Sequence, residues 1–419
     1  MRAQRLFAAT ADSSLSDSIA TIYLGLYNAM PYLESLEEQL KGQKTDLPVV
    51  VVDNDSTDGT WETVQAWKAI FGRRLTLVKN PRNLGGAGSL YLNADLIKTA
   101  WFMTFHQDDL YLPHHASTLC SAIDTAQEST ICITTEMGRL SPSGDILPTP
   151  ARASWFMPDT TPATVFLTNL RLHNVPFPAA AFKTTTFFEI ETPWHSTAFP
   201  DTEWVLSAAP NGTFEYVATE TMKYRENPQS ESHKLDREEK EIGATTALLR
   251  TFSRPGFRVL CQDVTGPNRD SFAHACLDGI DIRLSGVPEL SNLVKLAAAE
   301  QMASAWGYEP TPASEYVSKF YASIGSLRVP EFLLNIAPME AKREFETILK
   351  SSFHLPLVNI RHSDSEEQPK NTPLGKVGLL ANVASALVPP RLKRRLAKTL
   401  SFVLRNRLRN SPWGYSWKE

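Results

Sequence analysis

Nearly continuous apolar runs alternate with helical patterns along the first quarter of the chain. The predicted strands are 21–27, 47–53, 74–80 and 101–106, and the predicted helices are 30–40, 61–71 and about 86–99. Apolar runs of this length are typical of strands that are covered on both faces. The order predicts an α/β fold, a doubly wound and mostly parallel sheet with helices on both faces.

The pattern becomes mixed after residue 135 and then mainly helical. A polar, proline-containing stretch separates the helical part from a basic end, as a linker would. The predicted organisation is an N-terminal tail at 1–18, an α/β domain at 19–235, a helical C-terminal region at 236–360, a linker at 361–375 and a basic amphipathic tail at 376–419.

Composition places the chain among ordinary globular proteins. With 419 residues and 42% hydrophobic content, it can bury a large core. Its four cysteines lie far apart with no C-x-x-C pair, which predicts the reduced thiols of a cytosolic protein. No run has the length of a signal-peptide core or a membrane span, so we expect a cytoplasmic protein.

The end of the chain is basic and amphipathic. Residues 390–419 contain nine Lys or Arg and one acidic residue, so their charge is +8. Because the net charge of the whole chain is −4, the remaining residues carry −12. Apolar residues recur there at three- to four-residue intervals. This predicts a helix on an anionic membrane surface, the inner face of the plasma membrane. The alternative is a helix packed on the acidic body of the protein. Nucleic-acid binding is not expected, because the rest of the chain is acidic.

Aspartates follow two of the predicted strands. Asp53 ends one strand, and Asp108 and Asp109 follow another. The carboxyl ends of parallel strands meet at one edge of the sheet, where doubly wound folds bind ligands. A lone aspartate there can instead cap a helix. Adjacent carboxylates, however, suit a hard divalent cation such as Mg²⁺ or Mn²⁺ that keeps positions open for phosphate oxygens.

Four blocks of this region resemble family 2 glycosyltransferases, which have the GT-A fold. They are "LGLYNAMPYLESLEEQL", "VVVDNDSTDGT", "NPRNLGGAGS" and "FHQDDLYLP", in the order and rough spacing of that family. The glycine-rich block lacks the full G-x-G-x-x-G spacing of a dinucleotide-binding loop. Together with "DTEW", it is most similar to the branch that includes rhamnosyl- and galactofuranosyltransferases. The resemblance implies that 19–235 is a GT-A glycosyltransferase domain.

The resemblance also implies a site for a nucleotide-diphosphate sugar. Its implied binding residues are Tyr27, Asn28, Asp53, Asn83, Gly85, Gly86, Asp108 and Arg225. Asp108 and Asp109 would hold a divalent cation, Mn²⁺ or Mg²⁺, as this chain's variant of the D-x-D metal motif. His106 stands where the commonest form of the motif has its first aspartate, and Asn227 stands where the family has a histidine.

The segment "FPDTEWVLSAAPNG" is similar to the family's E-D-x-D/E segment and puts Asp201 at its catalytic aspartate. Pro200 and Ser207 occupy the usual glutamate and arginine positions, and Asp201 could instead only cap the helix that begins there. Sugar transfer needs a carboxylate that takes the proton from the attacking hydroxyl. Asp201 is the predicted base, with Glu203 as the alternative.

These features predict an inverting, metal-dependent hexosyl- or related transferase. It would move a sugar from a nucleotide-diphosphate sugar to a hydroxyl of a glycan or lipid-linked acceptor, in cell-envelope or polysaccharide synthesis. One alternative is a sugar-nucleotide pyrophosphorylase, which has a similar sheet but would carry a glycine-rich basic loop where this chain has "YNAMPYL". The other is a non-catalytic nucleotide-sugar-binding scaffold at the membrane, which is compatible with His106, Pro200, Ser207 and Asn227.

Overall fold

The computed structural model describes eight stretches of the chain. They are residues 6–9, 17–148, 161–172, 175–190, 199–227, 237–266, 268–285 and 288–307. All of them lie in the first of two compact units, Met1–Pro356, and the second unit is Leu357–Glu419. The last part of the predicted helical region, the linker at 361–375 and the basic tail at 376–419 therefore lie outside the described residues.

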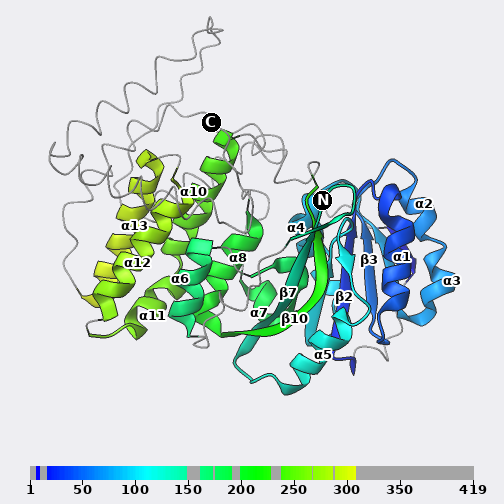
Figure 1. Ribbon diagram of the computed structural model, residues 1–419, viewed down its shortest axis with the longest axis horizontal. Coiled ribbons are helices and arrows are strands. Elements are labelled where there is room, and N and C mark those ends of the chain that lie inside the picture. The colour runs from blue at the N-terminus through cyan, green and yellow to red at the C-terminus, as the bar shows by residue number, and fades with distance from the viewer. Residues whose placement is uncertain are drawn as a thin grey trace, which may run out of the picture. The chain divides into compact units, whose positions relative to one another are not determined.

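A mixed sheet of ten strands forms the centre of the described fold (Figure 1). The strands are β1 (Leu6–Ala9), β2 (Ala20–Leu26), β3 (Val49–Asp53), β4 (Leu75–Lys79), β5 (Trp101–Phe105), β6 (Leu110–Tyr111), β7 (Thr130–Leu140), β8 (Ile146–Leu147), β9 (Ala180–Lys183) and β10 (Thr213–Arg225). Their order in the sheet is β1-β4-β3-β2-β5-β9-β7-β10-β6, and β8 pairs with β7.

The four predicted strands correspond to β2, β3, β4 and β5, and they pair in parallel as β4-β3-β2-β5. The chain therefore runs outward from β2 through β3 to β4, and then returns to the other side of β2 to form β5. This reversal makes the space beyond the ends of β2 and β5 the topological switch point of the sheet. Strands β7 and β10 add a second parallel pair, with β9 antiparallel between β5 and β7.

Helices cover the sheet and continue beyond it. They are α1 (Leu33–Gly42), α2 (Thr60–Val64), α3 (Trp67–Phe71), α4 (Gly85–Leu92), α5 (His115–Thr125), α6 (Pro162–Leu172), α7 (Thr184–Glu189), α8 (Pro200–Ala208), α10 (Arg237–Ser253), α11 (Pro255–Asp263), α12 (Asn268–Arg283) and α13 (Pro288–Trp306). None of the helices in the described part of the chain is both long and apolar enough to span a membrane.

Two predicted helices are interrupted. The helix predicted at 61–71 is split into α2 and α3, because the Ala66 N–H bonds to the Thr63 carbonyl in a tighter turn. The helix predicted at 86–99 ends after Leu92, where the Asn93 amide donates to the Ser89 carbonyl at 2.7 Å. Such a bond satisfies a carbonyl at the helix end and favours termination there.

Both faces of the parallel strands are buried. All five residues of β3 are inaccessible, and their side chains point alternately to the two faces. On one side lies α1, whose buried leucines are Leu33, Leu36 and Leu40. On the other side lies an aromatic cluster in which Phe187 stacks on Trp204 with ring centroids 4.8 Å apart. This arrangement confirms the predicted α/β class, a doubly wound sheet covered on both faces.

Helices α6 and α10–α13 gather beside the β7–β10 side of the sheet (Figure 1). They pack on one another and, through α8, on the sheet core, so their buried residues belong to the same hydrophobic cluster. The predicted helical character is thus seen as far as Trp306. The sequence did not predict β1, which lies within the expected N-terminal tail. This strand pairs antiparallel with β4.

Candidate functional site

The predicted site residues follow three neighbouring strands. Tyr27 and Asn28 come after β2, Asp53 ends β3, and the loop from His106 to Asp109 comes after β5. Because β3, β2 and β5 are adjacent and parallel, these segments meet at one edge of the sheet. The site predicted from sequence is therefore brought together at the topological switch point.

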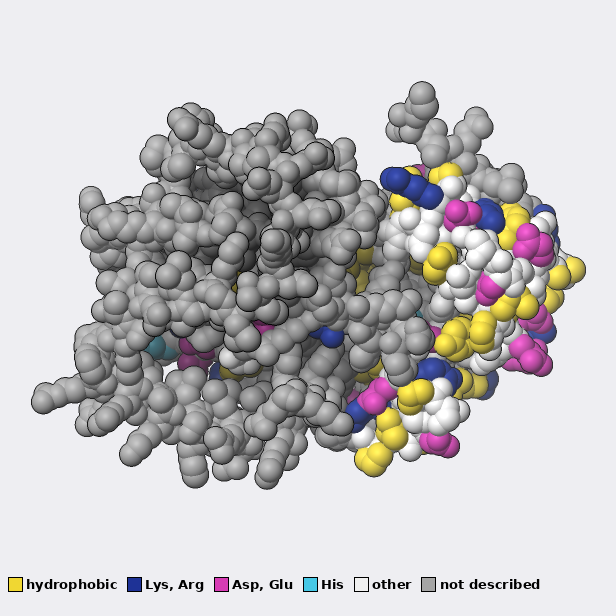
Figure 2. Space-filling view, turned by 90° about the horizontal axis from the view of Figure 1, so that it is seen from above, with side chains coloured by type: hydrophobic (Ala, Val, Ile, Leu, Met, Phe, Trp, Pro, Cys, Tyr) yellow, Lys and Arg dark blue, Asp and Glu magenta, His cyan; other side chains and the backbone are white. Residues whose placement is uncertain are grey.

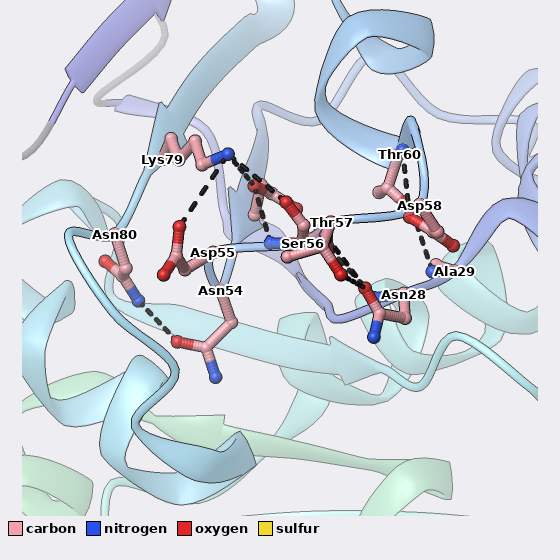
Figure 3. A network of polar contacts seen from close by, with 11 residues as sticks. Asn28, Ala29, Asn54, Asp55, Ser56, Thr57, Asp58, Thr60, Lys79 and Asn80 are labelled. Atoms are coloured by element: carbon pink, nitrogen blue, oxygen red, sulfur yellow. Dashed lines mark hydrogen bonds and ion pairs between the residues drawn. The ribbon is translucent and has the colours of Figure 1, made fainter.

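The turn after β2 is fixed by the loop that follows β3 (Figure 3). The Asn28 N–H donates to the Ser56 hydroxyl at 2.9 Å, and the Asn28 side-chain oxygen accepts the Thr57 N–H at 2.9 Å. Asn28 has a φ of 47°, a left-handed conformation that asparagine tolerates better than most residues. This turn leaves the neighbouring Tyr27 side chain 41% exposed, so its ring is available to a ligand.

Asp53 is a buried carboxylate with one unused oxygen. Its Oδ2 atom accepts the Ser56 N–H at 3.3 Å and lies 3.6 Å from the Lys79 ammonium, which also approaches Asp55 at 3.8 Å (Figure 3). Its Oδ1 atom has no hydrogen-bond partner among the described residues. Burial raises the pKa of Asp53, and the Ser56 and Lys79 contacts oppose that rise. The free oxygen is therefore an acceptor that a ligand donor can satisfy.

A network of asparagines holds the glycine-rich loop. Asn54 donates to the Asn83 side chain at 2.8 Å and to the Gly85 carbonyl at 3.2 Å, and Asn80 donates to Asn54 at 3.0 Å. Gly85 has a φ of 70°, which a residue with a side chain adopts at a cost. A Cβ atom at Gly86 would meet no described atom within 4 Å. The start of α4 is thus fixed in place and open on the Gly86 side.

Gln107 joins the ends of β5 and β2. Its side-chain oxygen accepts the Tyr27 N–H at 2.8 Å, and its side-chain nitrogen donates to the Tyr27 carbonyl at 3.1 Å. The Gln107 side-chain amide thus bonds to Tyr27 as the backbone of a neighbouring strand would. It does so at a point where β2 and β5 no longer pair. This contact fixes the distance between the Tyr27 segment and the carboxylates that follow Gln107.

Asp108 and Asp109 are held from the end of β10. The Arg225 N–H donates to Asp109 Oδ1 at 2.9 Å, and the Arg225 Nε–H donates to the Asp108 carbonyl at 2.7 Å. Asn227 donates to Asp108 Oδ2 at 2.8 Å. The Arg225 guanidinium also lies 3.5 Å from the Pro142 carbonyl. Arg225 and Asn227 therefore brace the acidic loop, a role that the sequence did not predict for either residue.

The two carboxylates differ in exposure. Asp109 is 3% exposed, and its Oδ2 atom lies 3.7 Å from His106 Nδ1 without a hydrogen-bond partner among the described residues. Burial and the charge of Asp108 raise the pKa of Asp109 well above its usual range, although Arg225 acts in the opposite direction. Asp108 is only partly buried. Asp108 is therefore the more accessible of the two.

His106 is the residue of this loop on which the charge of Asp201 acts. Burial lowers the pKa of His106, and the negative charges of Asp108 and Asp201 partly offset that effect. Both carboxylates are thus close enough to act on the same imidazole. Asp201 lies in the first turn of α8, 93 positions after Asp108 in the sequence, and is near enough for its charge to act on His106.

Asp201 and Glu203 have opposite environments although both lie in the first turn of α8. Asp201 is exposed and its Oδ1 atom accepts the Thr202 N–H at 2.8 Å. Glu203 is 0% exposed and its two oxygens accept hydrogen bonds from Arg250 at 2.9 and 3.1 Å. A general base must reach the proton that it removes. The placement of Glu203 argues against the alternative that it is the base.

The donor set suits a hard cation only in part. Carboxylate oxygens are the ligands that Mg²⁺ and Mn²⁺ prefer, and the unpartnered Asp109 Oδ2 atom beside Asp108 provides one. Within the described ranges, however, no group of three or more His, Cys, Asp or Glu side chains is arranged to hold a metal. A cation bound at Asp108 and Asp109 would take its other ligands from a diphosphate or from water.

Some residues that build the site carry no sequence signal. Gln39 of α1 accepts the Tyr111 N–H at 2.7 Å, and Gln43 donates to the Leu112 carbonyl at 3.1 Å. These two glutamines, one helical turn apart, fix the segment that follows the acidic loop. Gln39 lies on α1 and Gln43 directly follows its end, and no local pattern reveals their role because their partners lie about 70 residues away.

The surface near α1–α3 is of mixed charge. Figure 2 shows acidic and basic side chains interspersed with apolar ones on the visible part of this end of the molecule. On α1, Lys41 lies 2.6 Å from Glu37 and 3.1 Å from Glu38. Charges of both signs therefore alternate on this face.

Residues 21–187 match the family model described as Glycosyl transferase family 2. This match contains the strands and loops of the switch point, from β2 to β9. The match confirms, for this segment of the chain, the resemblance drawn from the four sequence blocks. The narrower likeness to rhamnosyl- and galactofuranosyltransferases stays a prediction.

A curated relative and solved structures are also similar. Abequosyltransferase RfbV of Salmonella typhimurium is 26% identical over 115 residues, which is 27% of this chain and 34% of that protein. This chain thus matches about a third of the relative's length. Residues 1–349 of TarS from S. aureus give a TM-score of 0.46 at 14% identity, over 78% of this chain and 90% of that one. A mannosyltransferase from Pyrobaculum calidifontis, in complex with GDP-Man and Mn²⁺, gives a TM-score of 0.43 at 16% identity, over 80% and 85% of the two chains.

Proposed function

We propose that the protein is a glycosyltransferase that moves a sugar from a nucleotide-diphosphate sugar to an acceptor hydroxyl. The observation that carries the proposal is the convergence of Tyr27, Asp53 and Asp108 at the switch point, within the segment that matches the family 2 model. Asp201 is near enough for its charge to act on His106 of the same loop as Asp108. Such a donor has three parts: a base, a ribose and a diphosphate. The Tyr27 ring, the Asp53 carboxylate and the acidic loop at Asp108 are the groups proposed to bind them. The family name of the matched segment agrees with this chemistry.

The donor-binding roles follow from accessibility. The exposed Tyr27 ring offers a flat apolar face to a nucleobase, and the free Asp53 Oδ1 atom accepts a hydrogen bond from the base or the ribose. At the start of α4, the open space at Gly86 lets a ligand approach the backbone closely, and Gly85 allows the left-handed turn that begins the helix. Asn28 and Asn83 act indirectly, because their side chains hold the loops that form these surfaces.

Asp201 is the proposed general base. Its exposed carboxylate would take the proton of the acceptor hydroxyl as that oxygen attacks the anomeric carbon and the bond to the diphosphate breaks. Attack from the side opposite the leaving group inverts the anomeric configuration. The charges of both Asp108 and Asp201 act on His106, so these two carboxylates are near the same side chain.

Asp108 and Asp109 are the proposed ligands of a divalent cation, Mn²⁺ or Mg²⁺. Such an ion, when bound, neutralises negative charge on the leaving diphosphate. Arg225 supports this half of the site by holding the loop through the Asp108 carbonyl and the Asp109 carboxylate. The proposal therefore changes the expected role of Arg225 from a direct diphosphate ligand to a brace of the acidic loop.

The acceptor and the cellular place are proposed from the sequence alone. A glycan or lipid-linked acceptor in cell-envelope or polysaccharide synthesis fits the proposed transfer and the name of the abequosyltransferase relative. The basic tail at 376–419 would hold the protein on the inner face of the plasma membrane. The domain boundaries predicted at 235 and 360 stay proposals as well.

A thermal-shift screen tests the proposed function. UDP-, dTDP- and GDP-sugars are each added with and without Mn²⁺, because a ligand that binds only the native state raises the melting temperature. We expect one nucleotide class to raise it, and more strongly with Mn²⁺. Release of nucleotide diphosphate from that donor would then distinguish an enzyme from a binding scaffold. Formation of nucleoside triphosphate and sugar 1-phosphate when pyrophosphate is added would favour a pyrophosphorylase. A chain that binds none of these donors does not have the proposed function.

A further inference from the structure

Helix α8 directs its two carboxylates in different directions. Residues two apart on a helix are separated by about 200° around the axis, so Asp201 and Glu203 cannot share a face. Asp201 is exposed at the site, whereas Glu203 is completely buried on the side of α10. Any rotation of α8 about its axis that moves Glu203 therefore turns Asp201 by the same angle.

Glu203 is bound by two arginines. Arg250 Nε lies 2.9 Å from Glu203 Oε1, and an Arg250 terminal nitrogen lies 3.1 Å from Oε2, so the pair is bidentate. Arg254 approaches Oε1 at 3.4 Å. Arg250 is 6% exposed and lies on α10, whereas Arg254 follows the end of α10 and directly precedes α11. A bidentate pair fixes the relative direction of two groups as well as their distance.

A neighbouring side of α8 packs on α7 and on strand β9 of the sheet. Trp204, 1% exposed, donates from its indole nitrogen to the Phe187 carbonyl at 3.1 Å. Its ring also meets Phe182 edge-on at 5.1 Å between centroids. Aromatic contacts of this kind hold the helix against the sheet, but a ring can slide over its neighbours more easily than a bidentate ion pair can. Besides the single Trp204 hydrogen bond, the bidentate pair with Arg250 is a two-point directional contact of α8.

Stability alone does not account for this ion pair. Apolar side chains of similar volume often stabilise a core as well as a buried ion pair does, because the charges lose their hydration. What apolar side chains do not supply is a fixed direction. The Glu203–Arg250 pair is therefore suited to fixing the rotation of α8. The group that this rotation orients is Asp201.

We infer that the Glu203–Arg250 pair positions Asp201 for proton abstraction, so that α10 of the helical region contributes to transfer without touching the substrate. This inference rests on the proposed function, because it needs Asp201 to be the base. Glu203 and Arg250 are positioning residues, since they act on the substrate only through α8.

Three variants separate orientation from stability. Arg250→Lys keeps the positive charge but cannot make the bidentate contact with Glu203. Glu203→Gln keeps the shape of the side chain but loses its negative charge. The double variant Glu203→Leu with Arg250→Met fills the same space with apolar groups and should melt near the wild-type temperature. The matched control is Asp281→Asn, which removes the 2.8 Å ion pair with Lys295 between α12 and α13, away from α8.

The first measurement is hydrogen exchange of residues 200–208, which does not depend on activity. We expect each of the three variants to raise it by about tenfold, with the control unchanged. The second is transfer kinetics, in which kcat should fall by about tenfold or more at a donor KM near normal, since a small misplacement of a reacting group is costly. The apolar double variant should remain slow although it is stable.

The outcomes are distinct. Unchanged exchange in α8, or faster exchange with a normal kcat, overturns the inference while leaving the proposed function intact. Full recovery of kcat in the apolar double variant also overturns it, because the pair would then serve stability only. If the wild-type protein neither binds nor transfers a sugar from any donor, the proposed function fails and the catalytic part of the inference fails with it.

Discussion

The Gln107 side chain bonds to both polar groups of the Tyr27 backbone. Its oxygen accepts the Tyr27 N–H at 2.8 Å, and its nitrogen donates to the Tyr27 carbonyl at 3.1 Å. The two residues are 80 positions apart in the chain and belong to the loops after β5 and β2. The contact spans the switch point, where the adjacent parallel strands β2 and β5 lead into separate loops. It therefore ties the proposed base-binding ring to the proposed diphosphate-binding loop.

Replacing Gln107 by Met should weaken donor binding. The methionine keeps the length of the side chain but loses both hydrogen bonds to Tyr27, each worth about 1 kcal/mol. We expect the affinity for the nucleotide diphosphate to fall by about tenfold, with kcat at saturating donor little changed. Calorimetry measures the affinity, and Gln127→Met, at an exposed glutamine between α5 and β7, is the control. Equal affinity in both variants would mean that Tyr27 does not need this support.

Much of the fold could be predicted because its central strands are buried on both faces. Such strands, like β3 with five inaccessible residues, give continuous apolar runs that stand out from the helices. The 13-residue strand β10 was missed because only some of its residues are buried, and in no regular alternation. The strand β1 was missed because four residues are too few to show a period.

The site could be predicted as a set of strand ends but not as a set of contacts. Asp53 and Asp108 were found because parallel strands bring their carboxyl ends together. The bonds from Arg225 and Asn227 to the acidic loop cross more than 115 residues of sequence, and no local pattern encodes such a pairing. Similarly, nothing in "DTEW" shows that Glu203 faces inward to an arginine 47 positions away.

Asp109→Asn should weaken the metal-dependent part of donor binding without unfolding the protein. The asparagine oxygen can still accept the Arg225 N–H, but the charge that attracts a divalent ion is lost. We expect the gain in nucleotide affinity on adding Mn²⁺ to shrink by about tenfold. Calorimetry with and without Mn²⁺ measures that gain, and Asp124→Asn, on the exposed side of α5, should keep it. An unchanged Mn²⁺ effect would remove Asp109 from the metal site.

Asp201→Asn should separate binding from transfer. The amide keeps the shape of the side chain but cannot take a proton, so transfer should fall by about a hundredfold or more. Donor affinity should stay near normal, because Asp201 is proposed to face the acceptor. Hydrogen exchange in α8 should also stay normal, unlike in Glu203→Gln, because Asp201 makes no bond to α10 in the described structure. Normal transfer by Asp201→Asn would exclude it as the base.

Deleting residues 390–419 should release the protein from membranes. The removed segment carries a charge of +8 together with the apolar positions of the predicted helix, so both kinds of contact with an anionic bilayer are lost. Cosedimentation with anionic vesicles should fall to the level seen with neutral vesicles, and turnover of a short water-soluble acceptor should persist. Aggregation or loss of donor binding would instead place this helix in the core.

His115 should make the protein sensitive to acid. The imidazole is 0% exposed, its Nδ1 atom lies 2.7 Å from the Thr221 hydroxyl, and the Tyr111 ring packs on it at 4.9 Å between centroids. Phe105 covers another side at 5.4 Å. Burial lowers the pKa of His115 to about 3, with the neighbouring His114 adding to the effect. The native structure therefore holds this histidine neutral.

The sign of the pH dependence follows from the proton that only the unfolded chain binds. An unfolded histidine titrates near pH 6.5, so between about pH 6.5 and 3 the unfolded state carries a proton on His115 that the native state lacks. The free energy of unfolding should thus fall on acidification across this window, with His115 contributing up to about 1.4 kcal/mol per pH unit. Above pH 6.5 its stabilising contribution is fully present.

Comparison of variants isolates this contribution from that of the carboxylates. In His115→Gln the group cannot titrate, so the urea-unfolding free energy should decline less steeply between pH 6.5 and 4 than in the wild type, even if its value at pH 7.5 is lower. His274→Gln, at an exposed position of α12, should retain the wild-type slope. The decisive quantity is the slope of the unfolding free energy against pH, not its absolute value. Loss of the bond to Thr221 lowers the unfolding free energy at every pH. Only loss of the titrating imidazole makes that free energy depend less on pH. Parallel curves for wild type and His115→Gln would show that the buried imidazole is protonated in the native state or is exposed before the protein unfolds.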